Sequence, residues 1–164
     1  MRTITFELDS KSIGRAAKQV EQYRKDLENA CQELVARLTD AGEQIAKLQV
    51  ISLGAFDTGE LESSIIGYYS PSLRAGLVKA GAWHAVFVEY GTGVVGKSNQ
   101  HPIPEGWSYD VSGHGDSGWV YKSDRDGNFH WTNGMPSRPF MYNTLRELEQ
   151  KVGSVADEVF ARLL

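Results

Sequence analysis

A long amphipathic stretch without proline, residues 12–53, constrains the fold most strongly. Its apolar residues recur every three or four positions and form one stripe: Ile13, Ala16, Val20, Tyr23, Leu27, Ala30, Leu34, Leu38, Ala41, Ile45 and Leu48. This is the helical period, so the sequence predicts one long helix, or two helices separated near residues 28–30. The alanines and Tyr23 favour packing of the stripe on a sheet over a coiled coil. Gly42 is expected to weaken the helix by about 1 kcal/mol relative to alanine.

A strand is predicted before this helix. Residues 3–8 alternate polar and apolar side chains, and this period of two is typical of a strand with one buried face. The apolar face consists of Ile4, Phe6 and Leu8. Either Asp9 or Ser10 is expected to cap the helix that follows.

Three more strands are predicted after the helix, at residues 64–69, 73–80 and 83–90, separated by Ser70-Pro71-Ser72 and by Gly81-Ala82. The third of them is rich in β-branched and aromatic residues, which suit a half-buried sheet. Their short connections predict an antiparallel meander. The third strand ends abruptly at Gly91, since glycine tolerates conformations that other residues avoid. Glu89 lies between apolar neighbours in that strand, so its carboxylate needs a partner. By charge, we expect Arg138 to be that partner.

Residues 94–134 are rich in glycine yet contain three of the four tryptophans, which a flexible linker would not. Residues 119–122 and 128–131 flank a turn at Asp126-Gly127 and predict a β-hairpin. We expect this arm to pack on a neighbouring copy; the alternative is that it folds back on its own core. The predicted contact residues are Trp107, Trp119, Tyr121, Phe129 and Trp131.

The last helix is expected to start at Ser137-Arg138-Pro139-Phe140, with Ser137 as its cap and the proline tolerated at its first turn. Its apolar stripe consists of Met141, Leu145, Leu148, Val152, Val155, Val159 and Leu163. Together these elements predict an α+β fold: an antiparallel sheet packed by the N-terminal and C-terminal helices, in a single domain over residues 1–164 with residues 94–134 as a hairpin arm.

Composition narrows the classes of function. A chain of 164 residues can bury a real core. Its net charge of −4 argues against electrostatic capture of nucleic acid, which needs a basic face. Cys31 is the single cysteine, so an intrachain disulfide is excluded and a reducing compartment is expected. Neither a signal peptide nor a membrane-spanning segment is predicted.

Several fragments resemble enzyme signatures. Asp57-Thr58-Gly59 is the tripeptide of aspartic proteases, but it follows a helix and has no second copy to share a proton with. The glycines from Gly91 to Gly96 are not expected to form a phosphate loop, because this stretch is not expected to open a helix. Histidines and Cys31 lie at no metal-ligand spacing, so neither a metal nor another cofactor is expected. Asp57 is expected to hold nearby amides in a turn.

Three motifs together carry a family resemblance: residues 57–65, residues 84–93 and residues 135–141, in this order after a long helical region. The chain resembles the tailed-phage neck family, the gene-product-ten-like head–tail joining and tail-completion proteins of siphophages. Its motif residues here are Asp57, Thr58, Gly59, Glu89, Gly91, Arg138, Pro139 and Phe140.

The resemblance implies a structural protein without catalysis, in a homo-oligomeric ring, a hexamer or a dodecamer, at the virion neck or upper tail. It would be assembled in the bacterial cytoplasm and would contact connector or head-closure proteins and tail-terminator or tail-tube proteins. Genome DNA would pass through the ring without specific binding, and no membrane would be involved. Two other interpretations stay open: a small hydrolase or peptidase that uses the Asp57 turn, and a monomeric regulatory binding module.

Overall fold

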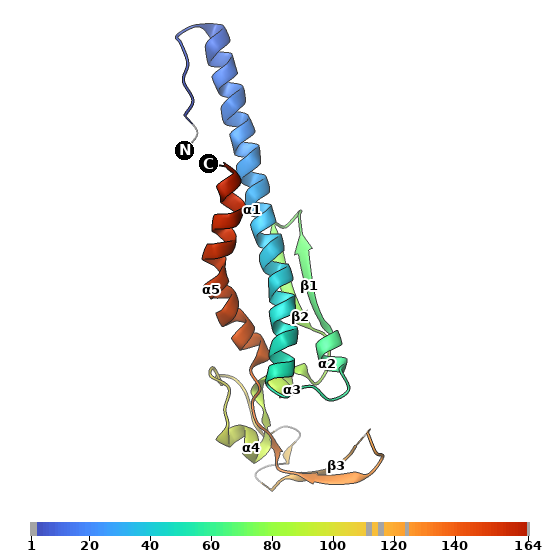
Figure 1. Ribbon diagram of the computed structural model, residues 1–164. Helices are drawn as coiled ribbons and strands as arrows, with labels where there is room; N and C mark the ends of the chain where they lie inside the picture. Colours follow the sequence, from blue (N-terminus) through green and yellow to red (C-terminus); the bar gives the residue numbers. More distant parts are fainter. Residues whose placement is uncertain (1–2, 111–112, 115–116, 124, 164) are drawn as a thin grey trace. The chain divides into compact units, whose positions relative to one another are not determined.

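The computed structural model describes residues 3–110, 113–114, 117–123 and 125–163 (Figure 1). It confirms the α+β class, with two long helices and two small antiparallel sheets. The chain divides into two compact units. Unit one contains the residues up to Gly42, Gly67–Val78 and the residues from Glu147 onward; unit two contains Glu43–Ile66 and Lys79–Arg146.

Helix α1, Ser10–Ser52, is continuous over 43 residues, so the alternative of a break near residues 28–30 is wrong. Asp9 caps it: its Oδ1 accepts the backbone N–H groups of Lys11 and Ser12, both at 2.9 Å. A carboxylate at this position is favourable, because the first amides of a helix have no partner within the helix. The predicted cap is therefore confirmed for Asp9.

In unit one, α1 packs closely on strand β2, Ala75–Ala80, and on helix α5, Phe140–Phe160. A Cβ added to Gly42 would lie 2.9 Å from Val78 Cγ2 and 3.0 Å from Leu148 Cδ1. One turn earlier, Thr39 occupies the space that a side chain at Gly76 would need. Gly42 thus permits the close approach that offsets its poor helix propensity.

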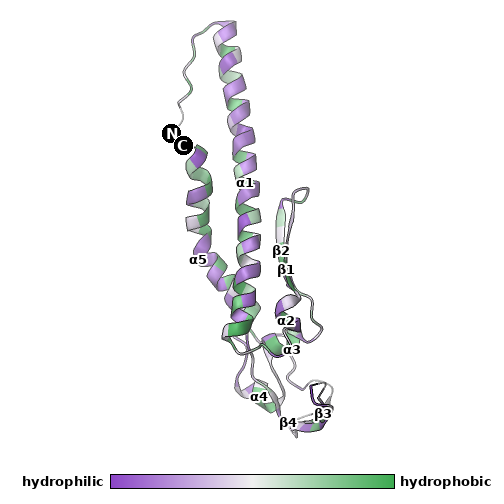
Figure 2. Cartoon of the chain, turned by 45° about the vertical axis from the view of Figure 1, so that its right-hand side comes forward, coloured by the Kyte–Doolittle hydropathy of each residue, from purple (hydrophilic) through white to green (hydrophobic). Residues whose placement is uncertain are grey.

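The N-terminal part of α1 does not pack on the sheet. Its apolar stripe is exposed at Ile13, Val20, Tyr23 and Leu27, by 38% to 56% of each side chain's surface. Figure 2 shows hydrophobic and hydrophilic residues alternating along this part of the helix. Close packing of α1 on the sheet is therefore confirmed near Thr39 and Gly42.

Residues 3–8 form no strand, which corrects the prediction. A strand needs a neighbouring strand to pair with its backbone, and the one backbone bond described in this stretch is local: Glu7 N–H donates to Ser12 Oγ at 3.0 Å. Phe6 and Leu8 are 56% and 94% exposed. The period-2 pattern is present without the sheet that it predicts.

Strands β1, Ile65–Ser70, and β2 form a two-stranded hairpin, as predicted. The predicted third strand is wrong, because residues Ala85–Tyr90 form helix α3. Ala85 and Val88 are buried there at helical spacing, whereas Val86 is exposed. A short apolar run fits either period, and the burial of Ala85 and Val88 favours the helix, in which His84 C=O accepts the N–H of Val88.

The remaining elements belong to unit two. They are helices α2, Glu60–Ser63, and α4, Gly93–Ser98, with strands β3, Trp119–Lys122, β4, Phe129–Thr132, and β5, Gly134–Met135. A short 3₁₀ turn, Ala161–Leu163, follows α5 in unit one. The buried apolar core of unit two consists of Ile45, Ala46, Val50, Leu61, Ile65, Ala85, Val88 and Phe140. No helix in the described part of the chain has the length and apolarity needed to span a membrane.

Candidate functional site

Glu89 is the centre of a densely bonded site in unit two. It is carried by α3 and is only 7% exposed. Its Oε2 accepts the backbone N–H of Met141 at 2.8 Å, and its Oε1 accepts that of Tyr142 at 2.9 Å. These two amides belong to the first turn of α5. Glu89 therefore caps a helix that begins about fifty residues later in the chain.

This geometry corrects two expectations from the sequence. The cap of α5 is Glu89 and not Ser137, whose hydroxyl donates to Glu89 C=O at 2.6 Å. Arg138 is not the partner of the carboxylate; its backbone N–H donates to Val88 C=O at 2.9 Å. Positive partial charge at a helix N-terminus stabilises a buried carboxylate as a guanidinium would, so the need for a partner is met by backbone.

His101 completes the surroundings of the carboxylate. Its Nε2 lies 3.1 Å from Glu89 Oε1, and both side chains are buried. On the other side of the ring, Nδ1 lies 2.8 Å from the Ile103 carbonyl oxygen and 3.0 Å from the Ile103 backbone nitrogen, so the imidazole is held between Glu89 and Ile103. The imidazole also contacts the rings of Tyr90 and Tyr142, with centroids 4.4 and 5.4 Å away.

Trp107 lies within unit two and not on a protruding arm. Its ring stacks on Tyr90 with centroids 5.0 Å apart, and its Nε1–H donates to Gly91 C=O at 3.0 Å. Gly91 has φ 77°, and a Cβ there would lie 2.6 Å from the Ser137 nitrogen. Residues around Gly91 and His101 therefore form one packed layer, and residues 94–134 cannot be treated as detachable.

Residues 91–98 open a helix, α4, which corrects the expectation that they do not. They also match the phosphate-loop consensus, since Lys97 and Ser98 follow Gly96. The geometry does not fit phosphate binding, because Lys97 lies in the last turn of α4 and not at the start of a helix. The N–H groups of Gly93 and Val95 already donate to the carbonyls of Tyr109 and Asn133.

Strands β3 and β4 form the predicted antiparallel hairpin, with Val120 opposite Trp131 and Lys122 opposite Phe129. Residues directly opposite each other share a face of the sheet. One face thus carries Val120, Lys122, Phe129 and Trp131, and the other carries Trp119, Tyr121, His130 and Thr132. We call the first of these the hairpin face.

The hairpin face is strongly apolar and exposed. Val120, Phe129 and Trp131 are 56%, 74% and 62% exposed. On the other face, Tyr121 packs against His130, with ring centroids 5.8 Å apart. Trp119 stacks on His114 at 5.0 Å and is half-buried. Of the predicted contact residues, the structure therefore brings Phe129 and Trp131 together with Val120, which sequence reasoning missed.

The hairpin turn is held by Asp126. Its carboxylate accepts the N–H of Asn128 at 3.0 Å and lies 2.9 Å from His130 Nε2. The hydrogen bond from the Asn128 backbone N–H is the largest cause that lowers the pKa of the Asp126 carboxyl, and the hydrogen bond from His130 is the second. Together they lower this pKa to about 2. Gly127 adopts φ 72°, as the predicted turn requires.

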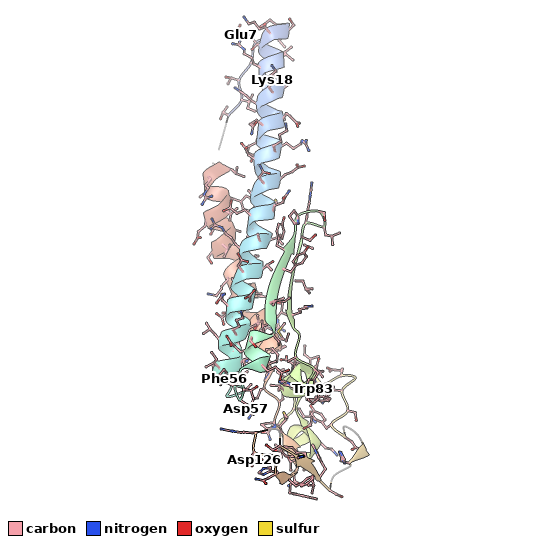
Figure 3. All side chains as sticks on the ribbon, turned by 90° about the vertical axis from the view of Figure 1, so that its right-hand side faces the viewer. Glu7, Lys18, Phe56, Asp57, Trp83 and Asp126 are labelled. Atoms are coloured by element: carbon pink, nitrogen blue, oxygen red, sulfur yellow. The ribbon has the colours of Figure 1, made fainter. Side chains whose placement is uncertain are left out.

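Asp57 lies on the exposed loop after α1 (Figure 3). Its Oδ1 is 3.5 Å from Arg125 Nη1, and this contact replaces the predicted bonds to nearby amides. Thr58 holds the turn instead, because its Oγ1 accepts the N–H of Glu60 at 3.3 Å. Gly59 follows with φ 85°. Within the described residues, no three histidine, cysteine, aspartate or glutamate side chains are placed to hold a metal ion.

The third motif, residues 135–141, leads directly into helix α5. Phe140 is 1% exposed and anchors the helix start, and Pro139 precedes it as the sequence predicts. The motif residues at 89, 91 and 138–140 thus meet at one site, whereas those at 57–59 lie in a separate turn. Comparison with protein-family models, curated proteins and solved structures finds no match for this chain.

Proposed function

We propose that this chain is a structural subunit of a homo-oligomeric ring in the neck of a tailed phage, where it joins the head connector to the tail. The resemblance of three ordered motifs supports this role. Two of these motifs meet in the buried network of Glu89, His101 and the start of α5. Such a network gives a ring subunit a rigid body, which a self-assembling structure needs.

The hairpin face is the observation that carries the proposal. Val120, Phe129 and Trp131 expose large apolar surfaces side by side on a hairpin of four-residue strands. Rigid aromatic side chains of this kind are typical anchors of protein–protein contacts. A head-to-tail contact through one such face on each subunit closes into a ring when the rotation fits. Genome DNA would pass through this ring without specific binding.

The test compares two variants of the hairpin. Phe129→Ser/Trp131→Ser removes the hairpin face, while Tyr121→Ser on the opposite face is the matched control. We expect the wild-type chain and the control to form rings, seen by native mass spectrometry and negative-stain electron microscopy. The double variant is expected to stay folded by circular dichroism and to form no rings.

Function is tested by complementation of a phage that lacks this chain. The double variant is expected to yield separate heads and tails, whereas the control yields joined particles. Normal joining by the double variant would refute the role of the hairpin face. Normal joining in the complete absence of the chain would refute the neck role itself.

A further inference from the structure

We propose that residues 13–27 of α1 pair with the same residues of a second copy of this chain, as two antiparallel helices. This part of α1 belongs to unit one. From residue 13 to residue 29 every residue is exposed or half-buried, whereas Ala30 is buried. Packing of an apolar face, more than helix propensity, stabilises most helices in proteins. The exposed apolar stripe of this part therefore needs a surface that covers it.

The spacing of the exposed stripe is that of a helix pair. Its apolar residues lie at positions 13, 16, 20, 23, 27, 30 and 34, so steps of three and four alternate without exception. This is the seven-residue repeat of coiled coils, in which two positions of each repeat face the partner helix. The alternation is interrupted at Leu38, which follows after a second step of four. The uninterrupted repeat thus includes all of the exposed stripe.

The sizes of these residues favour antiparallel over parallel helices. In one antiparallel register, Ala16 faces Leu27 of the partner subunit, and Val20 faces Tyr23 of the partner subunit. In a parallel pair in register, Ala16 would face a second alanine and Tyr23 a second tyrosine. That arrangement leaves a gap next to a bulky layer, which the close packing of protein interiors disfavours. The order of small and large residues therefore selects the antiparallel register.

Charge favours the same arrangement. Counted from the start of α1, residues 10–21 carry three basic side chains and one acidic side chain: Lys11, Arg15, Lys18 and Glu21. Residues 22–33 carry two basic and three acidic side chains: Arg24, Lys25, Asp26, Glu28 and Glu33. The antiparallel register places the net positive half of one helix on the net negative half of the other, whereas a parallel pair would place like charge on like charge.

The paired length ends where the chain covers its own helix. Ala30 is only 6% exposed, and Arg162 Nη1 lies 3.3 Å from Glu33 Oε1, so the end of the chain lies beside this level of α1 within unit one. In the antiparallel register, Ile13 of the partner subunit lies level with Ala30. The contact therefore spans the exposed part of the stripe and stops at its buried end.

The helix pair is two-fold symmetric, because both copies contribute the same residues. Such contacts close on themselves and give dimers, whereas a ring needs head-to-tail contacts. The helix pair thus differs from the ring contact proposed for the hairpin face, and it does not depend on the neck role. Its test uses chains with Phe129→Ser/Trp131→Ser, from which the hairpin face is removed.

Disulfide cross-linking in these chains tests the pairing and its direction. Cys31 is exposed, so Cys31→Ser is added to every variant. Chains with Ala16→Cys are mixed with chains carrying Leu27→Cys, oxidised, and analysed by peptide mass spectrometry. We expect the mixed disulfide in several-fold higher yield than disulfides between identical chains, because identical cysteines would lie roughly 16 Å apart along the antiparallel helices. In the matched control, Lys18→Cys replaces Ala16→Cys, since its side chain points away from the apolar stripe.

Two outcomes of the cross-linking would overturn the inference. Disulfides mainly between identical chains would show a parallel pair. Equal yields from Ala16→Cys and Lys18→Cys would show that the stripe does not form the contact. Failed ring formation by a chain with an intact hairpin face that still gives the mixed disulfide would count against the ring contact and leave the helix pair standing.

Sedimentation supplies a second measurement in the same chains. Val20→Glu/Leu27→Glu places two charges in the stripe, and Gln22→Glu/Asn29→Glu adds the same charge on the outward side of the helix. Both variants are expected to keep their helix content by circular dichroism, and only the first is expected to convert dimers to monomers. Equal association of the two variants, or a parent chain that stays monomeric at its highest soluble concentration, would also overturn the inference.

Discussion

The capping of α5 by Glu89 leads to the most quantitative prediction, for Glu89→Ala. The carboxylate accepts from two backbone amides, of Met141 and Tyr142, and from the ring of His101. A buried donor that loses its acceptor costs about 1–3 kcal/mol, so three such donors cost about 3–9 kcal/mol when no water replaces the carboxylate. Entry of water into the space left by the side chain lowers this cost. We expect a loss of about 4 kcal/mol in the free energy of unfolding.

The Glu89→Gln variant keeps the size of the side chain and removes its charge, so it tests the charge alone against the loss of the whole side chain in Glu89→Ala. The amide keeps one oxygen acceptor but points an NH₂ group at a donor, so we expect a loss of about 2–3 kcal/mol. Urea unfolding followed by tryptophan fluorescence measures both variants. Exchange of the Met141 and Tyr142 amides, followed by NMR, reports the cap locally and is expected to accelerate strongly.

Glu105→Ala is the control, because Glu105 is an exposed carboxylate in the same unit. Its effect is expected to stay within about 0.5 kcal/mol of zero. The reasoning would be refuted if Glu89→Ala lost less than about 1 kcal/mol, the scale of a single ordinary hydrogen bond. Unchanged protection of the Met141 and Tyr142 amides would refute it as well.

Two further predictions concern glycine packing and the hairpin turn. Gly42→Ala should destabilise the folded protein by about 1 kcal/mol, because overpacking against Val78 and Leu148 outweighs the gain in helix propensity. Gly14→Ala should stabilise it by up to about 1 kcal/mol, because a methyl group there meets open space. Thermal unfolding measures both variants, and changes of the same sign would contradict the reasoning. The pKa of Asp126 is lowered to about 2, so its contribution to hairpin stability is complete above about pH 4 and is lost as the pH falls through about 2. Carboxyl NMR titration should show this midpoint and a partial return towards the usual value in His130→Ala, and an unchanged midpoint in that variant would contradict the role of the hydrogen bond.

Elements set by local pattern could be predicted from the sequence. The stripes of α1 and α5 span many turns, and the Asp126-Gly127 turn with its flanking strands is a local signal. Short segments could not be predicted in this way. Residues 83–90 fit both periods, and the choice of a helix depends on which side chains the rest of unit two buries.

The site was only partly predictable for a related reason. The sequence shows that Glu89 needs a partner but does not show where one will lie. The partners are twelve to fifty-three residues away along the chain, at His101 and at backbone amides of α5. Every residue type except proline has a backbone N–H donor, so the sequence does not indicate which amides will bind Glu89, and the prediction of Arg138 from its opposite charge was wrong. His101 carried a signal, as one of only four histidines, but no spacing connected it to Glu89.

The long-range cap also affects the order in which the chain folds. Helix α1 carries its own cap at Asp9 and can form as soon as it is synthesised, whereas the first turn of α5 takes its cap from a residue made 52 positions earlier. Closing that loop has an entropic cost before the contact is gained, so the start of α5 should belong to a late step of folding. The last helix to be synthesised therefore joins a segment that must already be in place. Nascent chains stalled before Met141 would present Glu89 and His101 without the amides that stabilise their burial.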